Sequence, residues 1–269
     1  MENEFVDAEL TYIVDDGKPS IRYVDWPEEK HNERLASYEA RQTRIFNGRL
    51  LANPPKLDDF GFELLKRKSA VSNFYNETHL KELYYPETAE IIRQESGATS
   101  VHVFDHTVRT PDTSTHKEGW VRSPVRYVHN DYTERSAAQR VNDFFPDEAR
   151  DLLKKRFAII QTWRSIGARV ESEPLALCDG KTIPETGFIR NERRYRDRTA
   201  ETYHISYNPA HEWYYFPHMT NDELLIFKVF DTSQDVDVRF TAHTAFSDPN
   251  TNANAPARQS IEMRALAFF

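Results

Sequence analysis

Residues 99–107 read TSVHVFDHT, and at this stretch the sequence pattern changes from helical to strand-like. Apolar and polar residues alternate along it, as they do in a strand that buries one face. Further strands are expected in residues 124–131, 157–166, 174–178, 201–207, 223–230, 236–246 and 260–268. Seven or eight strands in the C-terminal two-thirds of the chain indicate a β-sandwich or a jelly-roll barrel.

The chain before residue 99 predicts helices that pack on the outside of this barrel. Residues 33–45 and 78–96 have helical patterns. Pro86 fits the first turn of a helix, where its missing N–H costs nothing, and Gly97 fits a C-terminal stop. Short extended pieces precede these helices at residues 10–14 and 21–24.

One more helix is expected over residues 136–155, with Ser136 as its cap. We therefore expect residues 1–269 to form a single domain that is mainly β with flanking helices. In this domain residues 1–98 would pack on a core made by residues 99–269.

Composition excludes several classes of function. The chain is 39% hydrophobic and 13% aromatic, which is enough for a packed interior. Its net charge is −8, whereas nucleic-acid binders usually carry a basic patch, so no nucleic-acid partner is expected. No apolar run reaches the roughly 18 residues of a membrane span. The eight glycines form no GxG, which excludes a Rossmann fingerprint and a P-loop.

The densest basic stretch is residues 190–198, where arginines are mixed with Glu192 and Asp197. We expect a solvated loop there, the alternative being a lid that contacts an anionic substrate. The lone cysteine, Cys178, permits no internal disulfide and is expected to be a buried, inert thiol. The acidic N-terminus, MENEFVDAEL, does not look like a secretory signal, so a cytoplasmic location fits best.

The first sign of chemistry is the sequence His129-Asn130-Asp131. Residues i and i+2 of a strand point to the same face, so His129 and Asp131 can reach one metal ion. His243, inside the strand-like sequence DVRFTAHTAF, is the best candidate for a third ligand. Two histidines and one carboxylate leave three open positions, an arrangement that suits non-haem iron(II) and oxygen chemistry.

The second sign is Arg258-Gln259-Ser260, which begins 258 − 243 = 15 residues after His243. A guanidinium fork binds a carboxylate through two hydrogen bonds, and a hydroxyl adds one more donor. Arg258 and Ser260 therefore fit the far carboxylate of 2-oxoglutarate. Arg264 has the same strand parity and is the alternative, unless it pairs with Glu262 or Asp237.

Other residues are candidates for the pocket. Tyr127 shares the parity of His129 and Asp131, so it is expected to line the pocket or to help bind 2-oxoglutarate. Arg164 is a candidate for a substrate or cofactor carboxylate. The substrate pocket is expected to include Trp163, Arg164, Trp213 and Tyr214. A competing metal cluster is conceivable at His102, Asp105 and His106, but no carboxylate-anchoring arginine follows it at a suitable spacing.

Several longer stretches resemble one family: YVHNDYT, TWRSI, PLALCDG, AHTAFSDP and ARQSIEMRALAFF. They look like the iron(II)/2-oxoglutarate-dependent hydroxylase/desaturases of secondary metabolism. That family includes the cephalosporin 7α-hydroxylase component of cephamycin biosynthesis, fungal gibberellin desaturase and related fungal enzymes. The resemblance covers about residues 55–269. Relatives often read WRP where this chain has Trp163-Arg164-Ser165, and the gap from Asp131 to His243 is long, 243 − 131 = 112 residues.

The resemblance implies a double-stranded β-helix, the jelly roll of cupin-like oxygenases, over residues 99–269. It implies Fe(II) held by His129, Asp131 and His243, and 2-oxoglutarate held by Arg258 and Ser260. With O2, such an enzyme hydroxylates or desaturates an unactivated C–H bond of a small-molecule substrate and converts 2-oxoglutarate to succinate and CO2. The alternatives are a cupin-like metal-binding protein or isomerase that does not use 2-oxoglutarate, and a barrel without metal. A homodimer is compatible with the sequence.

Overall fold

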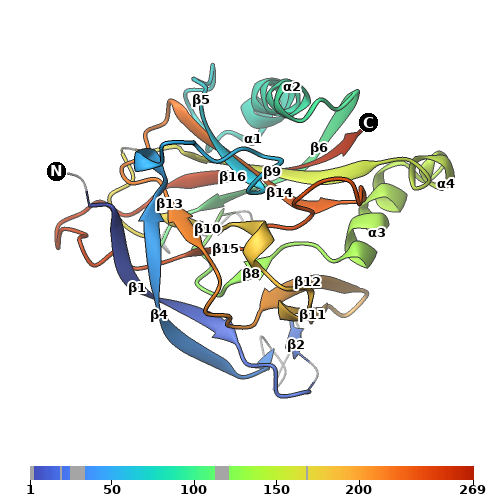
Figure 1. The fold of residues 1–269 in the computed structure, drawn as a ribbon. Helices are drawn as coiled ribbons and strands as arrows, with labels where there is room; N and C mark the ends of the chain where they lie inside the picture. Colours follow the sequence, from blue (N-terminus) through green and yellow to red (C-terminus); the bar gives the residue numbers. More distant parts are fainter. Residues whose placement is uncertain (1–2, 19, 25–33, 113–120, 168) are drawn as a thin grey trace.

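Two β-sheets face each other in the computed structural model, which describes residues 3–18, 20–24, 34–112, 121–167 and 169–269 (Figure 1). The larger sheet has the order β1 (Phe5–Ile13), β4 (Tyr38–Asn47), β13 (Trp213–Tyr215), β10 (Leu175–Cys178), β15 (His243–Ala245), β8 (His129–Asn130), β12 (Thr199–Ile205), β11 (Phe188–Arg194), β2 (Ser20–Tyr23) and β3 (Arg34–Leu35). The smaller sheet has the order β5 (Phe62–Lys66), β14 (Glu223–Asp231), β9 (Phe157–Ser165), β16 (Ser260–Phe268), β6 (Ser100–Arg109) and β7 (Val121–Arg122).

The central strands of the smaller sheet are buried on both faces. Every residue of β9 and β16 is buried. Their inner faces meet the larger sheet in a cluster that includes Trp163, Leu177 and Phe227. Their outer faces lie under a helical layer. Alternate side chains of these strands therefore point into two different apolar clusters, and neither face meets solvent.

The helical layer is built from α1 (Glu77–His79), the π-helical turn η3 (Leu80–Tyr84) and α2 (Tyr85–Ser96). It covers β6 and β16 (Figure 1). Pro86 lies in the first turn of α2, and Gly97 ends it in the left-handed conformation with φ of 72°. The predicted helix over residues 78–96 and its stop are therefore confirmed.

Residues 136–155 contain two helices, α3 (Glu134–Phe144) and α4 (Ala149–Leu152). Thr133, rather than Ser136, caps α3, because the Thr133 hydroxyl accepts from the Ser136 backbone N–H and the Ser136 hydroxyl accepts from the Thr133 N–H. Short 3₁₀ turns occur at η2 (Gly48–Leu50), η5 (Gly180–Thr182) and η6 (Glu185–Gly187).

Two predictions of secondary structure are wrong. The described part of the predicted helix over residues 33–45 is not helical, because β4 pairs antiparallel with β1 from Phe5↔Phe46 to Ile13↔Tyr38. Residues 190–198 are not a loop, because β11 and β12 form a hairpin and only the residues between the two strands turn. In both cases pairing with a neighbouring strand outweighs the preference that the local sequence suggests.

The predicted strands over residues 124–131 and 236–246 are shorter than expected, and only His129–Asn130 and His243–Ala245 pair as strands. Within the described part of the chain, six strands were not expected: β3, β4, β5, β7, β11 and β13. Among the described residues, none of the helices has the length and apolar character needed to cross a membrane.

Candidate metal centre

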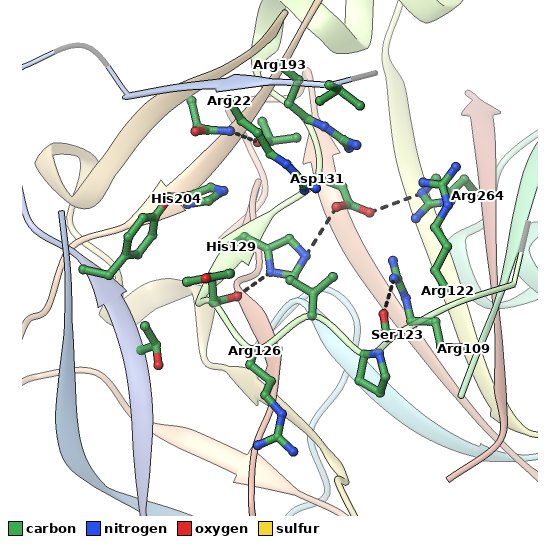
Figure 2. A pocket seen from close by; sticks show the side chains of 18 of the residues that line it. Arg22, Arg109, Arg122, Ser123, Arg126, His129, Asp131, Arg193, His204 and Arg264 are labelled. Atoms are coloured by element: carbon green, nitrogen blue, oxygen red, sulfur yellow. Dashed lines mark hydrogen bonds and ion pairs between the residues drawn. The ribbon is translucent and has the colours of Figure 1, made fainter. Parts of the chain in front are cut away.

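Strand pairing brings His129 and His243 together in the larger sheet. β8 lies between β15 and β12, and His243 is the direct cross-strand partner of His129. Their ring centroids are 4.3 Å apart. Asp131 follows β8, and its Oδ1 lies 3.5 Å from Nε2 of His129 (Figure 2). One ligand atom from each of the three residues lies within 4.8 Å of the others, the geometry of a metal site.

The two imidazoles are held in forms suited to metal binding. His129 Nδ1 lies 2.7 Å from the carbonyl oxygen of Tyr127, so this nitrogen carries the proton and Nε2 keeps its lone pair. Burial and the neighbouring His129 lower the pKa of His243 to about 3. His243 is therefore neutral at ordinary pH. Its Nδ1 is buried and has no hydrogen-bond partner among the described residues.

Asp131 is held from behind by two donors. Its Oδ2 accepts from Gln161 Nε2 at 2.7 Å. The same oxygen accepts from Arg264 Nε at 3.2 Å (Figure 2). Burial raises the pKa of Asp131, but the positive charge of Arg264 outweighs burial and holds the pKa well below its ordinary value. A carboxylate that stays ionised, with one oxygen already occupied, presents the other oxygen to a cation.

A small pocket beside the two histidines contains Arg258 and Trp163. Arg258 is 3% exposed and donates from Nη1 to the carbonyl oxygen of Glu173 at 2.6 Å. Arg258 Nε and the Ser260 hydroxyl are buried without a hydrogen-bond partner in the described part of the chain. Buried donors without acceptors are costly, so this pair fits a missing carboxylate. The residues present thus fit both a metal and a dicarboxylate cosubstrate.

Arg264, the alternative carboxylate anchor, is engaged elsewhere. Besides Asp131 it contacts Asp105, Thr107 and Glu262, and Asp237 is not among its partners. These contacts, together with that to Asp131, occupy all three nitrogens of its guanidinium. Arg264 therefore supports the metal centre through its hydrogen bond to Asp131.

The prediction that Arg164 lies in the substrate pocket is wrong. Adjacent strand residues face opposite sides, and Trp163 takes the inner one. Arg164 points to the outer layer, where it donates to the Tyr84 hydroxyl and to the carbonyl oxygens of Arg67 and Asn221.

The three remaining pocket candidates, Trp213, Tyr214 and Tyr127, do not lie together in one pocket. Trp213 donates to the Tyr12 hydroxyl at 2.8 Å in a separate cluster, and Tyr214 packs on Phe60 and Phe62, so neither lines the two cavities at the centre. Tyr127 lies in a larger cavity rather than the small pocket, with its ring 4.6 Å from that of Tyr38.

The competing metal cluster does not form. His102 packs on the rings of Phe144 and Phe145, and Nδ1 of His106 meets the Tyr85 hydroxyl at 2.8 Å. Asp105 pairs with Arg264. Among the described residues, the triad of His129, Asp131 and His243 is the one metal-competent group of this kind. Cys178 is buried as expected, and burial raises its pKa strongly.

The larger cavity, of about 1120 Å³, opens beside His129 and Asp131. Six arginines line it: Arg22, Arg109, Arg122, Arg126, Arg193 and Arg264. Sequence reasoning missed this grouping and missed Gln161, because their neighbourhood depends on strand pairing. The sequence contains one signal that could have indicated the cavity. Asn191, Arg193 and Tyr195 occupy every second position of one extended segment, and all three line the cavity.

The chain is similar to known proteins over most of its length. The profile described as "Oxidoreductase/YMDC permease-like domain" matches residues 10–268. The chain is 32% identical over 223 residues to the alpha-ketoglutarate-dependent dioxygenase phiK of Fungal sp. (strain ATCC 74256), covering 80% of this chain and 79% of that protein. It is 31% identical over 257 residues to the hydroxylase/desaturase CTB9 of Cercospora beticola, covering 86% and 78%.

Solved structures show the same fold. The iron and alpha-ketoglutarate-dependent endoperoxidase NvfI superposes with a TM-score of 0.88 at 23% identity, covering 99% of both chains. This likeness confirms the predicted jelly-roll architecture of mainly β structure with flanking helices.

Proposed function

This chain belongs to the family of Fe(II)/2-oxoglutarate-dependent hydroxylase/desaturases of secondary metabolism, and on that premise we propose that His129, Asp131 and His243 bind its iron. We propose further that Arg258 and Ser260 bind the far carboxylate of 2-oxoglutarate. The resemblance read from the sequence is confirmed by these relatives.

The protein is a dioxygenase that uses Fe(II), 2-oxoglutarate and O2. It hydroxylates or desaturates an unactivated C–H bond of a small-molecule metabolite, while 2-oxoglutarate becomes succinate and CO2. The bound iron supplies the oxidising chemistry, and the protein supplies position and the exclusion of water.

Different residues of this chain orient the metal ligands and bind the cosubstrate. The Tyr127 carbonyl orients His129, and Gln161 and Arg264 orient Asp131. Arg258 anchors the far end of the cosubstrate, so that its other end is directed toward the triad. Trp163 lines the same pocket, and Phe227, 5.0 Å from the ring of His243, belongs to the apolar core around it.

One observation carries the proposal: ligand atoms of His129 and Asp131 and of the distant His243 lie within 4.8 Å of one another. It is tested by anaerobic titration with Fe(II) and 2-oxoglutarate, following the weak visible absorption band that the two give when bound together. Wild type should bind one Fe(II), show the band, and form succinate in air. His243→Ala should lose both iron and band.

His102→Ala, which alters a histidine of the rejected cluster, is the matched control and should behave as wild type. Iron binding without the band or succinate would favour a cupin-like protein that does not use 2-oxoglutarate. A band that survives in His243→Ala would count against the assigned ligands.

We also propose a cytoplasmic location and an enzyme that works without nucleic acid or membrane, as a monomer or a homodimer. The single, buried cysteine supports a reducing compartment. Light scattering of the purified protein and fractionation of the source cells test these points.

A further inference from the structure

Arg109 lines both cavities at the metal centre. It is the last residue of β6, and it contributes to the wall of the small pocket and to that of the larger cavity. Two other described residues do the same, Val125 and the metal ligand His129. Among the described residues, Arg109 is therefore the one arginine, lysine or carboxylate that the two cavities share.

Strand register places Arg109 beside Ser260. The two residues are direct partners where β6 pairs antiparallel with β16, so their side chains project from the same face of the smaller sheet. Glu262, two residues after Ser260, projects from that face as well. The face that carries the Ser260 hydroxyl, a donor proposed above for the far carboxylate of 2-oxoglutarate, therefore also carries Arg109.

The Arg109 side chain extends from Ser260 toward the metal ligands. Its Nε donates to Oε2 of Glu262 at 3.1 Å, and Glu262 lies about 7 Å beyond Ser260 along β16. Two residues further along the same strand, Arg264 donates to Asp131. The guanidinium of Arg109 therefore lies between the proposed site of the far carboxylate and the triad.

Part of this guanidinium is available to a ligand. Nη1 donates to the carbonyl oxygen of Ser123 at 3.2 Å (Figure 2). Nη2 makes no hydrogen bond to any residue that the structure describes. The partner of Arg109, Glu262, also accepts from Arg264 through its other carboxylate oxygen. One carboxylate thus serves two guanidinium groups and does not by itself balance both charges.

The small pocket has an excess of positive charge. Two arginines, Arg109 and Arg258, and one carboxylate, Glu262, are the charged groups in its described wall besides the histidine ligands. Burial, together with the positive charge of Arg109, lowers the pKa of Arg258 to about 10, so the two cations lie close enough to repel each other. A ligand with a carboxylate at each end would relieve this repulsion at both arginines.

We propose that Arg109 binds the second carboxylate of 2-oxoglutarate, the one next to the keto group, while Arg258 and Ser260 bind the far one. A guanidinium donates well to a carboxylate, and one at each end holds the dicarboxylate extended along β16 with its keto end toward the triad. This inference rests on the proposed function, because it takes the small pocket as the cosubstrate site.

The test separates the two ends of the cosubstrate with a keto acid that keeps only one of them. 2-Oxopentanoate has the keto group and its adjacent carboxylate, but a methyl group replaces the far carboxylate. Anaerobic titration of the Fe(II)-loaded enzyme with each acid, following the visible band or competition with 2-oxoglutarate, gives the two Kd values. Wild type should bind both acids, and 2-oxoglutarate more tightly.

Arg109→Met should raise the Kd of both acids about tenfold or more, because both keep the carboxylate that Arg109 binds. Arg258→Met should raise the Kd of 2-oxoglutarate and leave that of 2-oxopentanoate unchanged. Arg49→Met is the matched control, since it breaks a partly buried pair with Glu223 that lines neither cavity. It should bind both acids as wild type does.

Glu262→Gln distinguishes direct binding by Arg109 from support of the fold. This variant removes the ion pair but keeps the Arg109 guanidinium, so the Kd of 2-oxopentanoate should not rise. A rise equal to that in Arg109→Met would overturn the inference, because Arg109 would then act only through Glu262. Should Arg109→Met fail to fold, the double variant Arg109→Met/Glu262→Gln removes both partners of the pair and should still raise the Kd of 2-oxopentanoate.

The inference is also overturned if Arg109→Met binds 2-oxopentanoate as tightly as wild type, the result expected of an arginine that contacts only the substrate. The same holds if wild type forms the band with 2-oxoglutarate but does not bind 2-oxopentanoate at all. Absence of the band in wild type with 2-oxoglutarate would instead remove the proposed function itself.

Discussion

Arg264 donates from Nε to Oδ2 of Asp131 at 3.2 Å, and this contact joins the last strand of the smaller sheet to the metal centre of the larger one. Residues 131 and 264 are far apart in sequence, yet the guanidinium fixes which carboxylate oxygen remains for a cation. The same guanidinium also contacts the buried Glu262 and the exposed Asp105, so it balances the charge of several carboxylates.

Loss of this contact should weaken metal binding. Arg264→Met should reduce Fe(II) affinity about 10- to 100-fold, the usual cost of removing an outer-shell partner of a metal ligand. It should also destabilise the fold by about 3–5 kcal/mol, because buried carboxylates lose their counter-charge. Metal titration and urea unfolding measure the two effects. Arg140→Met, at a partly exposed arginine of α3 that pairs with Asp143, is the control, and an unchanged iron affinity in Arg264→Met would contradict the assigned role.

Arg258 should act on the cosubstrate and leave the metal alone. Arg258→Lys keeps the charge but loses the fork, so the KM for 2-oxoglutarate should rise about tenfold, and Arg258→Met should raise it further. Succinate formation in the absence of substrate gives the KM. Iron content should stay at the wild-type level, as it should in the surface control Arg169→Met. Equal loss of iron and cosubstrate would argue that Arg258 is structural.

Stability in the absence of metal should fall in mild acid, in part through His211. Burial lowers the pKa of His211 to about 4, below the value of about 6.5 in the unfolded chain, so the unfolded state binds the proton first. Stability from this group is complete above pH 6.5 and declines as the pH falls toward 4. His211→Phe should remove up to about 2 kcal/mol of the stability difference between pH 7.5 and pH 5.

Urea unfolding of wild type and His211→Phe at the two pH values makes the comparison. The conservative control is His79→Phe, since His79 is exposed on α1. Identical pH dependence in wild type and His211→Phe would contradict the explanation.

Gly61 should tolerate no side chain. Its φ is +87°, and a Cβ there would collide with Thr241 and Val238, in the segment that leads to His243. Gly97 has a similar φ of +72° but open space around it. Gly97→Ala should therefore cost about 1 kcal/mol from backbone strain alone. Gly61→Ala should cost more than about 2 kcal/mol, because overpacking is added. Equal costs in thermal unfolding would exclude the steric contribution.

The sequence alone determined features that depend on local periodicity. The shared face of His129 and Asp131 and the strands predicted over residues 157–166 and 260–268 follow from side-chain alternation. The end of α2 at Gly97 follows from the left-handed backbone conformation that glycine adopts there. The choice of His243 as a partner also came from its strand pattern, together with the chemistry that three such ligands permit.

Tertiary structure alone decided which residues meet across strands. It placed residues 38–45, part of an expected helix, in β4. It also directed Arg164 away from the pocket, brought Arg264 to Asp131, and gathered four arginines from two sheets. The physical reason is that alternation says which face of a strand a side chain occupies. It does not say which strand lies alongside or in what register, because that depends on hydrogen bonds between segments distant in sequence.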